Sequence, residues 1–411
     1  MKHYLVGGAV RDRLLGLKVY ERDHVVIGST PEELVEHGFR QVGRGFPVFL
    51  HPQTHEEYAL ARKELKTGSG HTGFHCAFGP EVTLEQDLLR RDLTINAMAE
   101  DEQGRIIDPY GGQKDIEQRC LRHVSAAFSE DPLRLLRVAR FASHLARFGF
   151  QIAPETLELM RTISQSGELE TLTPERVWKE TERALLSPNP SVYFQVLQCT
   201  DALKPLFPEL AALIGVPQNP QWHPEVDTWL HTQMALEQSA VLNTSLAVRF
   251  AVLTHDLGKA STEDHLLPHH PGHGERGIPI INQLALRLRV PRDLREIAIK
   301  VAAWHISIHR LANTKDGTPT SEILHILNGL DGFRRPNRVH DVVLACRCDI
   351  RGRLGHEQAQ YPQGQWLLDA LQAASKVRAA DLNNQSLDGT EIAHALHEAR
   401  MHAIDQLSST R

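Results

Sequence analysis

Segments with the pattern of β-strands occur only in the first sixty or so residues of this chain. They are short apolar or β-branched runs bounded by Gly, Pro or polar residues, at residues 4–6, 24–27, 47–50 and 58–61. Helical patterns at residues 10–15 and 31–37 separate them, and Thr30 is suited to cap a helix that begins with Pro31. This alternation predicts a small mixed sheet flanked by helices.

Helical periodicity dominates from the sequence DPYGG at residues 108–112 to the last residue. The clearest helices are predicted at residues 132–148, 174–186, 229–242 and 291–306. The predicted fold class is therefore α+β, with a mixed-sheet head followed by all-α parts. A length of 411 residues is enough for two to four domains.

The composition excludes several classes of protein. The formal net charge is −6, so this is not a uniformly basic nucleic-acid coat, and any RNA contact must come from a local patch. The five cysteines form no CxxC pair, which favours a reducing, cytoplasmic location. No apolar run is long enough for a transmembrane helix, and the N-terminal sequence lacks the apolar core of a signal peptide, so we expect no membrane association.

The first candidate site combines a double glycine with a pair of acidic residues. Gly7 and Gly8 end a predicted strand and open a helix, where backbone N–H groups and Arg11 can approach a phosphate. Glu21 and Asp23 lie two residues apart at the start of the next strand, which places both side chains on one face. Carboxylates this close repel each other, and Mg²⁺ relieves the repulsion. Phosphoryl transfer uses such an arrangement.

Each half of this pattern is weak alone, because acidic pairs are usually solvated. In this order, however, the sequence resembles the head of the DNA polymerase β nucleotidyltransferase superfamily. A second motif, RRDLTINA, is predicted to place Asp92 and Asn96 one helical turn apart beside Arg91. The alternative is an ion-paired surface helix. The motif resembles the one that contacts the ribose and triphosphate of the incoming nucleotide in that superfamily.

The third motif, EDPLRLLRVARF, begins at residue 130. Asp131, Arg134, Arg137 and Arg140 are three residues apart and form a slowly winding polar stripe on a helix. The alternative is a simple i,i+3 ion pair. One carboxylate and one guanidinium also match the Watson–Crick edges of cytosine and adenine, whereas uracil and guanine leave like groups facing each other.

Taken together, the motifs resemble those of the bacterial class II CCA-adding enzymes (tRNA nucleotidyltransferases). GGAVRD with the acidic pair, RRDLTINA, DPYGG, EDPLRLLRVARF and LTPERVWKE follow one another in the family's order over residues 7–180. The resemblance implies addition of CCA to tRNA from CTP and ATP without a nucleic-acid template, by a monomer or a homodimer.

The resemblance also implies roles for individual residues. Glu21 and Asp23 become the catalytic Mg²⁺ ligands, and Asp131 and Arg134 the protein template for the base. The implied nucleotide contacts are Gly8, Arg11, Arg91, Arg137 and Arg140. The KTGSGHTG segment after Ala61, predicted to be a mobile loop, corresponds to the flexible element that switches from C to A addition. One departure matters: the family has aspartate at both metal-ligand positions, and Glu21 extends its carboxylate by one methylene.

A fourth candidate site lies in the histidine-rich part of the chain. Nine of the 24 histidines fall between residues 223 and 309, around the sequence HDLGK. This part resembles the HD phosphohydrolase superfamily, in which His and Asp ligands hold a metal ion that activates water. The implied candidate ligands are His231, His255, Asp256, His270, His273, His305 and Asp349, whereas His265 and His309 are expected to be solvated or to lie outside the ligand set.

An imidazole-rich site favours Ni²⁺, Co²⁺ or Mn²⁺ over Mg²⁺. The resemblance implies phosphatase, 2′-nucleotidase and 2′,3′-cyclic phosphodiesterase activities. The alternatives are solvated histidines without function and a degenerate HD domain that only docks tRNA.

The sequence thus predicts a polymerase-β-like nucleotidyltransferase head at residues 1–112 and a helical neck and body at 113–220. An all-α HD domain at 221–380 and a helical tail at 381–411 follow. Three rival functions remain open: a poly(A) polymerase or partial CC- or A-adding enzyme, an HD phosphohydrolase with a weakened head, and a tRNA-binding chaperone without catalysis.

Overall fold

The computed structural model describes residues 1–42, 48–66, 74–311, 319–381 and 388–409. The chain forms two compact units, and the chain path alternates between them. The first unit comprises Met1–Ala184 and Val192–Leu206, and the second comprises Leu185–Ser191 and Phe207–Arg411. In the described part of the chain, no helix is both long and apolar enough to cross a membrane.

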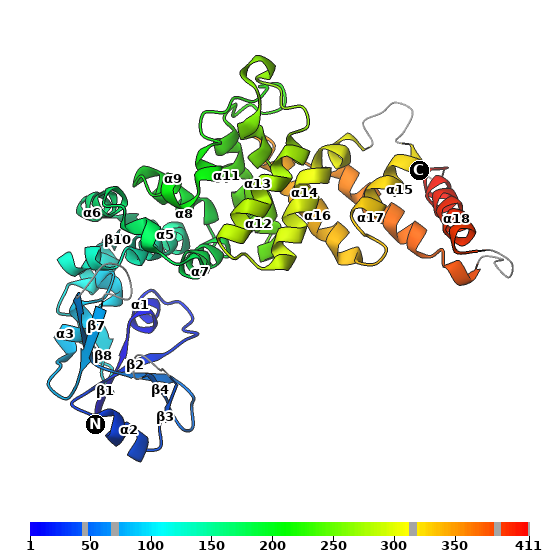
Figure 1. Ribbon diagram of the computed structural model, residues 1–411. Helices are drawn as coiled ribbons and strands as arrows, with labels where there is room; N and C mark the ends of the chain where they lie inside the picture. Colours follow the sequence, from blue (N-terminus) through cyan, green and yellow to red (C-terminus); the bar gives the residue numbers. More distant parts are fainter. Residues whose placement is uncertain (43–47, 67–73, 312–318, 382–387, 410–411) are drawn as a thin grey trace. The chain divides into compact units, whose positions relative to one another are not determined.

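A seven-stranded mixed sheet forms the centre of the head, in the order β3-β4-β5-β2-β1-β8-β9 (Figure 1). Its strands are β1 (Lys2–Val6), β2 (Asp23–Ile27), β3 (Arg40–Gln41), β4 (Val48–Leu50), β5 (Glu57–Leu60), β8 (Ala99–Glu100) and β9 (Ile106–Ile107). Neighbouring strands run antiparallel except β2 and β5, which are parallel. The prediction of a mixed sheet is confirmed.

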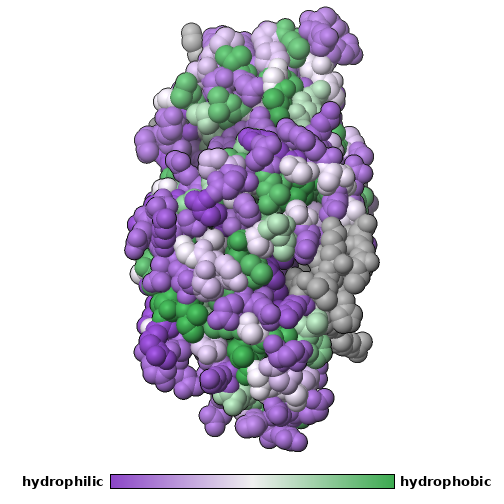
Figure 2. Space-filling view, turned by 90° about the vertical axis from the view of Figure 1, so that its left-hand side faces the viewer, coloured by the Kyte–Doolittle hydropathy of each residue, from purple (hydrophilic) through white to green (hydrophobic). Residues whose placement is uncertain are grey.

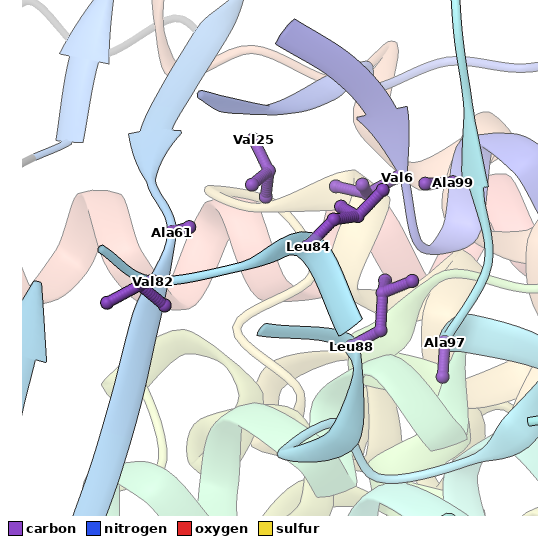
Figure 3. Packing of buried hydrophobic residues seen from close by; sticks show 8 residues of the cluster. All are labelled: Val6, Val25, Ala61, Val82, Leu84, Leu88, Ala97 and Ala99. Carbon is purple, nitrogen blue, oxygen red and sulfur yellow. The ribbon is translucent and has the colours of Figure 1, made fainter. Parts of the chain in front are cut away.

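Alternation along β2 gives the sheet two apolar faces, because successive side chains point to opposite sides. Val26 packs with Leu34 of helix α2 (Pro31–Glu36), which Thr30 caps as predicted. On the other face, Val25 packs with Leu84 and Leu88 of α3 (Leu84–Leu89), and Figure 3 shows these residues beside Val6. Packing on both faces holds β1 and β2 in place, and the candidate site lies where β1 ends and β2 begins.

Some short strands escaped prediction. Strands β6 (Arg62–Lys66) and β7 (Phe74–Phe78) form an antiparallel pair on either side of the predicted KTGSGHTG loop, whose residues 67–73 lie outside the described residues. Strands β10 (Cys120–Leu121) and β11 (Gln151–Ile152) pair in parallel in a region predicted to be entirely helical. A strand of two residues is too short to show alternation, so sequence periodicity cannot reveal it.

The rest of the first unit is mostly helical. Its helices, beside α2 and α3, are α1 (Gly8–Leu14), α4 (Gly112–Glu117), α5 (Leu133–Leu145), α6 (Pro154–Gln165), α7 (Pro174–Leu185), α8 (Pro190–Cys199) and α9 (Leu203–Leu206). Helices α7 and α8 include residues assigned to the second unit. Helix α5 buries Leu135, Leu136 and Val138, so its opposite side is left to carry polar residues.

The second unit is a helical bundle (Figure 1). Its helices are α10 (Pro208–Ala211), α11 (Thr228–Val241), α12 (Leu246–Thr254), α13 (His273–Arg287), α14 (Arg292–Arg310), α15 (Thr320–Gly329), α16 (Pro336–Arg351), α17 (Pro362–Ser375) and α18 (Gly389–Ser409). Helix α12 packs against α11, α14 and α16, and α18 packs against α15 and α17. In the described part of the predicted helical tail at residues 381–411, α18 is one long helix.

On the face of the molecule shown in Figure 2, hydrophilic residues predominate and hydrophobic ones form small scattered groups.

A buried arginine ties residues 185–191 to this bundle. Arg249 is only 4% exposed, and its Nη1 donates hydrogen bonds to the carbonyl oxygens of Leu185 and Ser187, at 2.6 and 2.8 Å. The backbone N–H of Ser191 donates to Glu237 at 2.8 Å. These contacts explain why a short segment upstream of the bundle belongs to it.

Candidate functional site

The double-glycine turn lies at the C-terminal end of β1. Gly7 has φ 73°, a conformation that L-residues with side chains rarely adopt, and a Cβ at this position would lie 2.9 Å from Nη1 of Arg91. In the antiparallel register of β1 and β2, Val6 pairs with Asp23. Asp23 therefore begins its strand directly beside the glycine turn.

Glu21 and Asp23 both reach the surface at this point. Surrounding protein raises the pKa of Asp23 by desolvation, attraction to Arg91 opposes this shift, and repulsion from Glu21 adds to it. This repulsion indicates that the carboxylates of Glu21 and Asp23 lie close to each other. Hard oxygen ligands of this kind suit Mg²⁺, so the residues present fit the predicted ion.

A chain of polar contacts connects the glycine turn to the neck. Arg11 of α1 is 6% exposed, and its Nη1 donates to Oδ1 of Asn96 at 2.8 Å. Nδ2 of Asn96 donates to Oδ1 of Asp92 at 3.0 Å, and Nε of Arg137 in α5 donates to Oδ2 of Asp92 at 2.7 Å. The RRDLTINA motif is thus the link between α1 and α5.

The prediction that Asp92 and Asn96 lie one helical turn apart is wrong. Leu93 is extended, and only Thr94–Asn96 form a short 3₁₀ helix. The carboxylate of Asp92 accepts a hydrogen bond from the backbone N–H of Leu93 at 2.9 Å. Aspartate competes in this way for backbone donors that a helix needs elsewhere. The two side chains still meet, because the tight turn brings them together.

Burial disfavours the charged form of Asp92, but attraction to Arg137 and hydrogen bonds from Asn96 and Arg137 outweigh it. The pKa of Asp92 is therefore well below its usual range. Burial lowers the pKa of Arg91, whose Nη2 donates to the buried Asp87 at 3.3 Å. These ionised groups hold the turn in one arrangement.

The polar stripe of α5 is organised by partners from other elements. Oδ2 of Asp131 accepts from Nη2 of Arg176 at 3.0 Å, and its Oδ1 accepts from the backbone N–H of Leu133 at 3.1 Å. Nη1 of Arg134, which is 6% exposed, donates to the carbonyl oxygen of Ala127 at 2.6 Å. Both predicted template residues are held in fixed positions at the start of the helix.

Three guanidinium groups surround the buried ring of Phe141. Arg11, Arg137 and Arg140 lie 5.1, 5.6 and 4.2 Å from its centroid. Arg140 is also paired with Glu180 at 2.5 Å. The structure thus brings together three of the predicted nucleotide contacts from α1 and α5. Arg176 and Glu180, which pair with Asp131 and Arg140, come from the LTPERVWKE motif, but no local sequence signal predicts these partners.

The second site is a buried cluster of histidine and aspartate side chains in the helical unit. It is built from the ends and interiors of α11, α12, α13, α14 and α16. Its members are His231, His255, Asp256, His273, His305, His309 and Asp349. Gly258 permits this arrangement, because a Cβ there would lie 1.9 Å from the carbonyl oxygen of His273.

The Nε2 atoms of the histidines converge on the two carboxylates. His255 and His273 lie 3.2 and 3.3 Å from Asp256, and His305 lies 3.8 Å from it. His231 lies 3.1 Å from Asp349. All of these residues are almost completely buried. Buried carboxylates facing several imidazoles are typical of a metal site.

The Nδ1 atoms of three cluster histidines face backbone carbonyl oxygens. His255 faces Val252 at 2.7 Å, His273 faces His270 at 2.8 Å, and His305 faces Val301 and Ala302 at 3.0 Å. Because a carbonyl can only accept, Nδ1 carries the hydrogen and Nε2 presents a lone pair to the cluster. This is the arrangement that metal-binding histidines require.

One prediction about this cluster is corrected. His270 is predicted to be a candidate ligand, but its Nδ1 bonds the hydroxyl of Thr262 at 2.8 Å and its Nε2 the carbonyl of Pro217 at 2.9 Å, so its nitrogens are directed elsewhere. His309 is predicted to lie outside the ligand set, and its Nε2 lies 2.7 Å from Oδ2 of the candidate ligand Asp349. His265 is exposed, as expected.

Sequence reasoning missed Glu225, which precedes α11. Its Oε1 lies 2.9 Å from Nδ1 of His231 and 3.0 Å from Nδ1 of His223. Burial opposes its ionisation, but hydrogen bonds from the two histidines outweigh this and lower its pKa. Burial also lowers the pKa of His223 to about 4. The next residue, Val226, has φ 60°, a strained value for a β-branched side chain.

The charged groups of the cluster shift one another's pKa values. Burial would lower the pKa of His255, but attraction to Asp256 and Asp349 and a hydrogen bond with Asp256 outweigh it and raise the pKa. Burial alone would raise the pKa of Asp256, but His255 and Lys259 outweigh it, so the pKa lies well below its usual value. Burial would also raise the pKa of Asp349, but attraction to His309 and hydrogen bonds with His231 and His309 outweigh it and lower the pKa well below its usual value. Burial and the neighbouring imidazoles of His273 and His255 keep the pKa of His305 well below its usual value, so this ligand is neutral.

Comparison with protein families matches two parts of the chain. Residues 3–122 match the family described as the poly A polymerase head domain. Residues 149–214 match the family described as a probable RNA- and SrmB-binding site of polymerase A. The matched segments contain the glycine turn, the acidic pair and RRDLTINA in the first case, and part of the neck in the second.

Several solved structures share the fold. A CCA-adding enzyme in an apo form is 21% identical and has a TM-score of 0.66, with 98% of this chain and 88% of that chain covered. A CCA-adding enzyme in complex with ATP is 20% identical with a TM-score of 0.63, with 98% and 86% covered. The Thermotoga maritima CCA-adding enzyme complexed with tRNA is 20% identical with a TM-score of 0.59, with 100% and 92% covered. The chain therefore has the fold of these enzymes.

Proposed function

We propose that the first unit adds and repairs the 3′-terminal CCA of tRNA, using CTP and ATP and no nucleic-acid template. The observation that carries the proposal is the position of Glu21 and Asp23 beside the glycine turn of a head with the fold of CCA-adding enzymes. The motifs that the family places around its nucleotide all lie in this unit.

In the proposed reaction the terminal hydroxyl of the tRNA attacks the α-phosphate of the nucleotide and expels pyrophosphate. Glu21 and Asp23 would hold Mg²⁺, which supplies charge stabilisation for the attacking and leaving oxygens. Arg11, Arg91 and the neck arginines offset the charge of the triphosphate. Asp131 and Arg134 accept from the exocyclic amine and donate to the ring nitrogen of C or A, and so reject U and G.

The test is incorporation of labelled CTP and ATP onto tRNA that lacks its 3′ end, with Mg²⁺. Addition of CC followed by a single A is the expected product. Long A tails support a poly(A) polymerase, and arrest after CC or a requirement for a CC end supports a partial enzyme. The Asp23→Asn variant serves as the inactive control, and tRNA binding without incorporation in the wild type contradicts the proposal.

We propose a second activity for the helical unit, the metal-dependent hydrolysis of phosphate esters by an HD domain at residues 221–380. The observation that favours it is the preformed His–Asp cluster, in which Oδ1 of Asp256 is buried and makes no hydrogen bond. A bound Ni²⁺, Co²⁺ or Mn²⁺ ion would activate water for attack on phosphorus. The predicted substrates are phosphomonoesters, 2′-nucleotides and 2′,3′-cyclic nucleotides.

This activity is tested with 2′,3′-cyclic AMP and a phosphomonoester, each with Ni²⁺, Co²⁺, Mn²⁺ or Mg²⁺. Hydrolysis with the first three ions and its loss in Asp256→Asn are expected, whereas His265→Ala, which changes an exposed histidine, retains activity. A wild-type protein that hydrolyses neither substrate, yet still docks tRNA through this unit, supports the degenerate-domain alternative.

A further inference from the structure

A fully buried carboxylate lies behind the two arginines that begin the RRDLTINA motif. Asp87 of α3 is 0% exposed. Its Oδ1 accepts hydrogen bonds from Nε and Nη2 of Arg90 at 3.1 and 2.9 Å, and its Oδ2 accepts one from Nη2 of Arg91 at 3.3 Å. Burial opposes ionisation, but attraction to the two arginines outweighs it and lowers the pKa of Asp87. The carboxylate is therefore charged and shared between two neighbouring side chains.

The same carboxylate reaches the strand that leaves the head sheet. The backbone N–H of Ala61 donates to the carbonyl oxygen of Val26 in β2 at 2.9 Å. The next N–H, that of Arg62, donates to Oδ1 of Asp87 at 3.2 Å. Arg62 begins β6 and pairs with Phe78 of β7. Asp87 thus holds the backbone where the chain passes from the head sheet to the β6–β7 pair.

Arg91 extends from Asp87 to the glycine turn. Its Nη1 donates to the carbonyl oxygen of Asn96 at 3.4 Å and lies 2.9 Å from the place that a Cβ on Gly7 would occupy. Attraction to Arg91 also opposes the rise in pKa that burial causes at Asp23. Arg91 therefore lies beside the turn and acts on the acidic pair, while Asp87 holds its Nη2 atom.

A neutral group in place of Asp87 would leave two adjacent arginines with little compensating charge. The side chains of Arg90 and Arg91 are each only 18% exposed. Keeping a poorly compensated guanidinium buried is unfavourable, so the Arg91 side chain would turn towards solvent and away from the glycine turn. A ligand that binds Arg91 must then also fix a long side chain with many rotamers, which weakens binding. Asp87 removes this cost by holding the side chain in advance.

We infer that Asp87 is a positioning residue for nucleotide binding, which holds Arg91 beside the glycine turn and ties its position to the start of β6. One carboxylate oxygen accepts from Arg91 and the other from the backbone N–H of Arg62. A displacement of β6 therefore turns the carboxylate and moves the guanidinium. Because Asp87 is buried, it acts through Arg91. This role rests on the proposed nucleotidyl transfer, in which Arg91 contacts the triphosphate.

Steady-state kinetics of Asp87→Asn test this role, with CTP on tRNA that lacks CCA and with ATP on tRNA that ends in CC. We expect KM for both nucleotides to rise about 10-fold and kcat to stay within about two-fold, because Arg91 contacts the triphosphate before and during the reaction. Asp87→Glu keeps the charge and shows a smaller rise. Glu85→Gln, which changes an exposed acid of the same helix, leaves KM unchanged. A merely structural role reduces the amount of active enzyme, so a lower kcat at the wild-type KM overturns the inference.

The link to β6 is tested by removing the N–H of Arg62 while Asp87 stays in place. Proline is tolerated at the first residue of a strand, so Arg62→Pro removes the N–H, whereas Arg62→Ala keeps it and removes only the side chain. We expect KM for both nucleotides to be about three-fold higher in Arg62→Pro than in Arg62→Ala. Combined with Asp87→Asn, Arg62→Pro causes no further rise, because both changes act on one contact. Equal KM values in the two Arg62 variants, or additive effects in the combined variant, overturn the link.

Calorimetric titration of the full chain with CTP and Mg²⁺, without tRNA, separates this role from the proposed function. We expect Asp87→Asn to bind CTP about 10-fold more weakly than the wild type, because the loss concerns binding and not turnover. A wild type that binds CTP but adds nothing to tRNA overturns only the proposed function. Equal affinities of the wild type and Asp87→Asn overturn only the role of Asp87, and a wild type that does not bind CTP overturns both.

Discussion

Glu21 differs by one methylene group from the aspartate of the family that this sequence resembles. Asp23 is held by pairing with Val6 of β1 and with Glu57 of β5, whereas Glu21 lies two residues before this strand. The extra methylene therefore moves the carboxylate of Glu21 relative to a fixed Asp23. A displacement of about 1 Å in a reacting or metal-holding group costs on the order of 100-fold in rate.

We predict that Glu21→Asp raises kcat for CTP addition in Mg²⁺, by up to about 100-fold. The measurement is steady-state incorporation onto tRNA that lacks CCA. Glu57→Asp applies the same shortening one strand away and leaves kcat unchanged. A Glu21→Asp variant with the wild-type rate shows that the side chain already compensates for its length.

Glu225 faces the proposed metal site through His231. Its Oε1 lies 2.9 Å from Nδ1 of His231, whose Nε2 lies 3.1 Å from Oδ1 of Asp349. Loss of such an outer partner typically weakens metal binding by about 10–100-fold. We predict this loss for Glu225→Ala, measured by Co²⁺ competition with a chelator, and a smaller loss for Glu225→Gln.

Glu263 provides the matched control, because it pairs with the exposed His265. Glu263→Ala should leave Co²⁺ affinity unchanged. Wild-type affinity in Glu225→Ala means that helix packing alone orients His231.

At the scale of secondary structure, α5 does more than carry Arg134, one of the two residues proposed to choose the base. Its Arg137 closes the polar chain that begins at Arg11 of α1 and passes through Asn96 and Asp92. The stability of the head is thereby linked to the position of the neck helix. Asp92 is buried, whereas 36% of the Arg137 side chain is exposed.

We predict that Arg137→Met lowers the free energy of unfolding of the first unit by about 2–3 kcal/mol at pH 7. Breaking a fully buried pair costs roughly 3–5 kcal/mol, and water at Arg137 reduces this. Urea unfolding followed by circular dichroism measures the change. Arg105→Met, which removes an exposed ion pair with Asp101, should have little effect.

The stability difference between the wild type and Arg137→Met should depend on pH. The pKa of Asp92 is lowered in the folded protein, so its contribution is fully present above the unfolded value of about 3.9 and is lost as the pH falls through the folded value. The difference between wild type and Arg137→Met should be constant from pH 7 to about pH 5 and shrink below pH 4. A difference that grows on acidification contradicts this assignment.

Elements with strong periodicity could be predicted from sequence, and those decided by tertiary contacts could not. Thr30 and Pro31 marked the start of α2, and α5 follows directly from its apolar spacing. The extended backbone at Leu93 could not be foreseen, because the competing hydrogen bond comes from a single side chain. His270 was misassigned because its role depends on which way its ring faces in the folded bundle.

On the scale of the whole molecule, the two units alternate along the chain. Residues 185–191 belong to the helical unit, although 192–206 belong to the first. The sequence predicts a boundary at residue 220, but nothing in it marks the earlier exchange at residues 185–191, where Arg249 binds main-chain carbonyl groups. Main-chain acceptors have no sequence signature.

We predict that a fragment of residues 185–411 unfolds cooperatively and is more stable than 207–411 by at least about 3 kcal/mol. The shorter fragment leaves the buried Arg249 without the carbonyl oxygens of Leu185 and Ser187. Thermal and urea unfolding provide the comparison. Fragment 192–411 is the control and should behave like 207–411; if it matches 185–411 instead, residues 185–191 are dispensable.

This alternation also constrains how such a protein can change over generations. No single break point in the chain separates the two units. A gene fusion with one crossover therefore produces a protein in which one of the two units combines residues from both parents. A crossover after residue 206 separates Arg249 from its carbonyl partners at Leu185 and Ser187, and a crossover before residue 185 separates residues 192–206 from the rest of the first unit. Lineages can therefore refine each half by point substitution far more easily than they can trade one half for another.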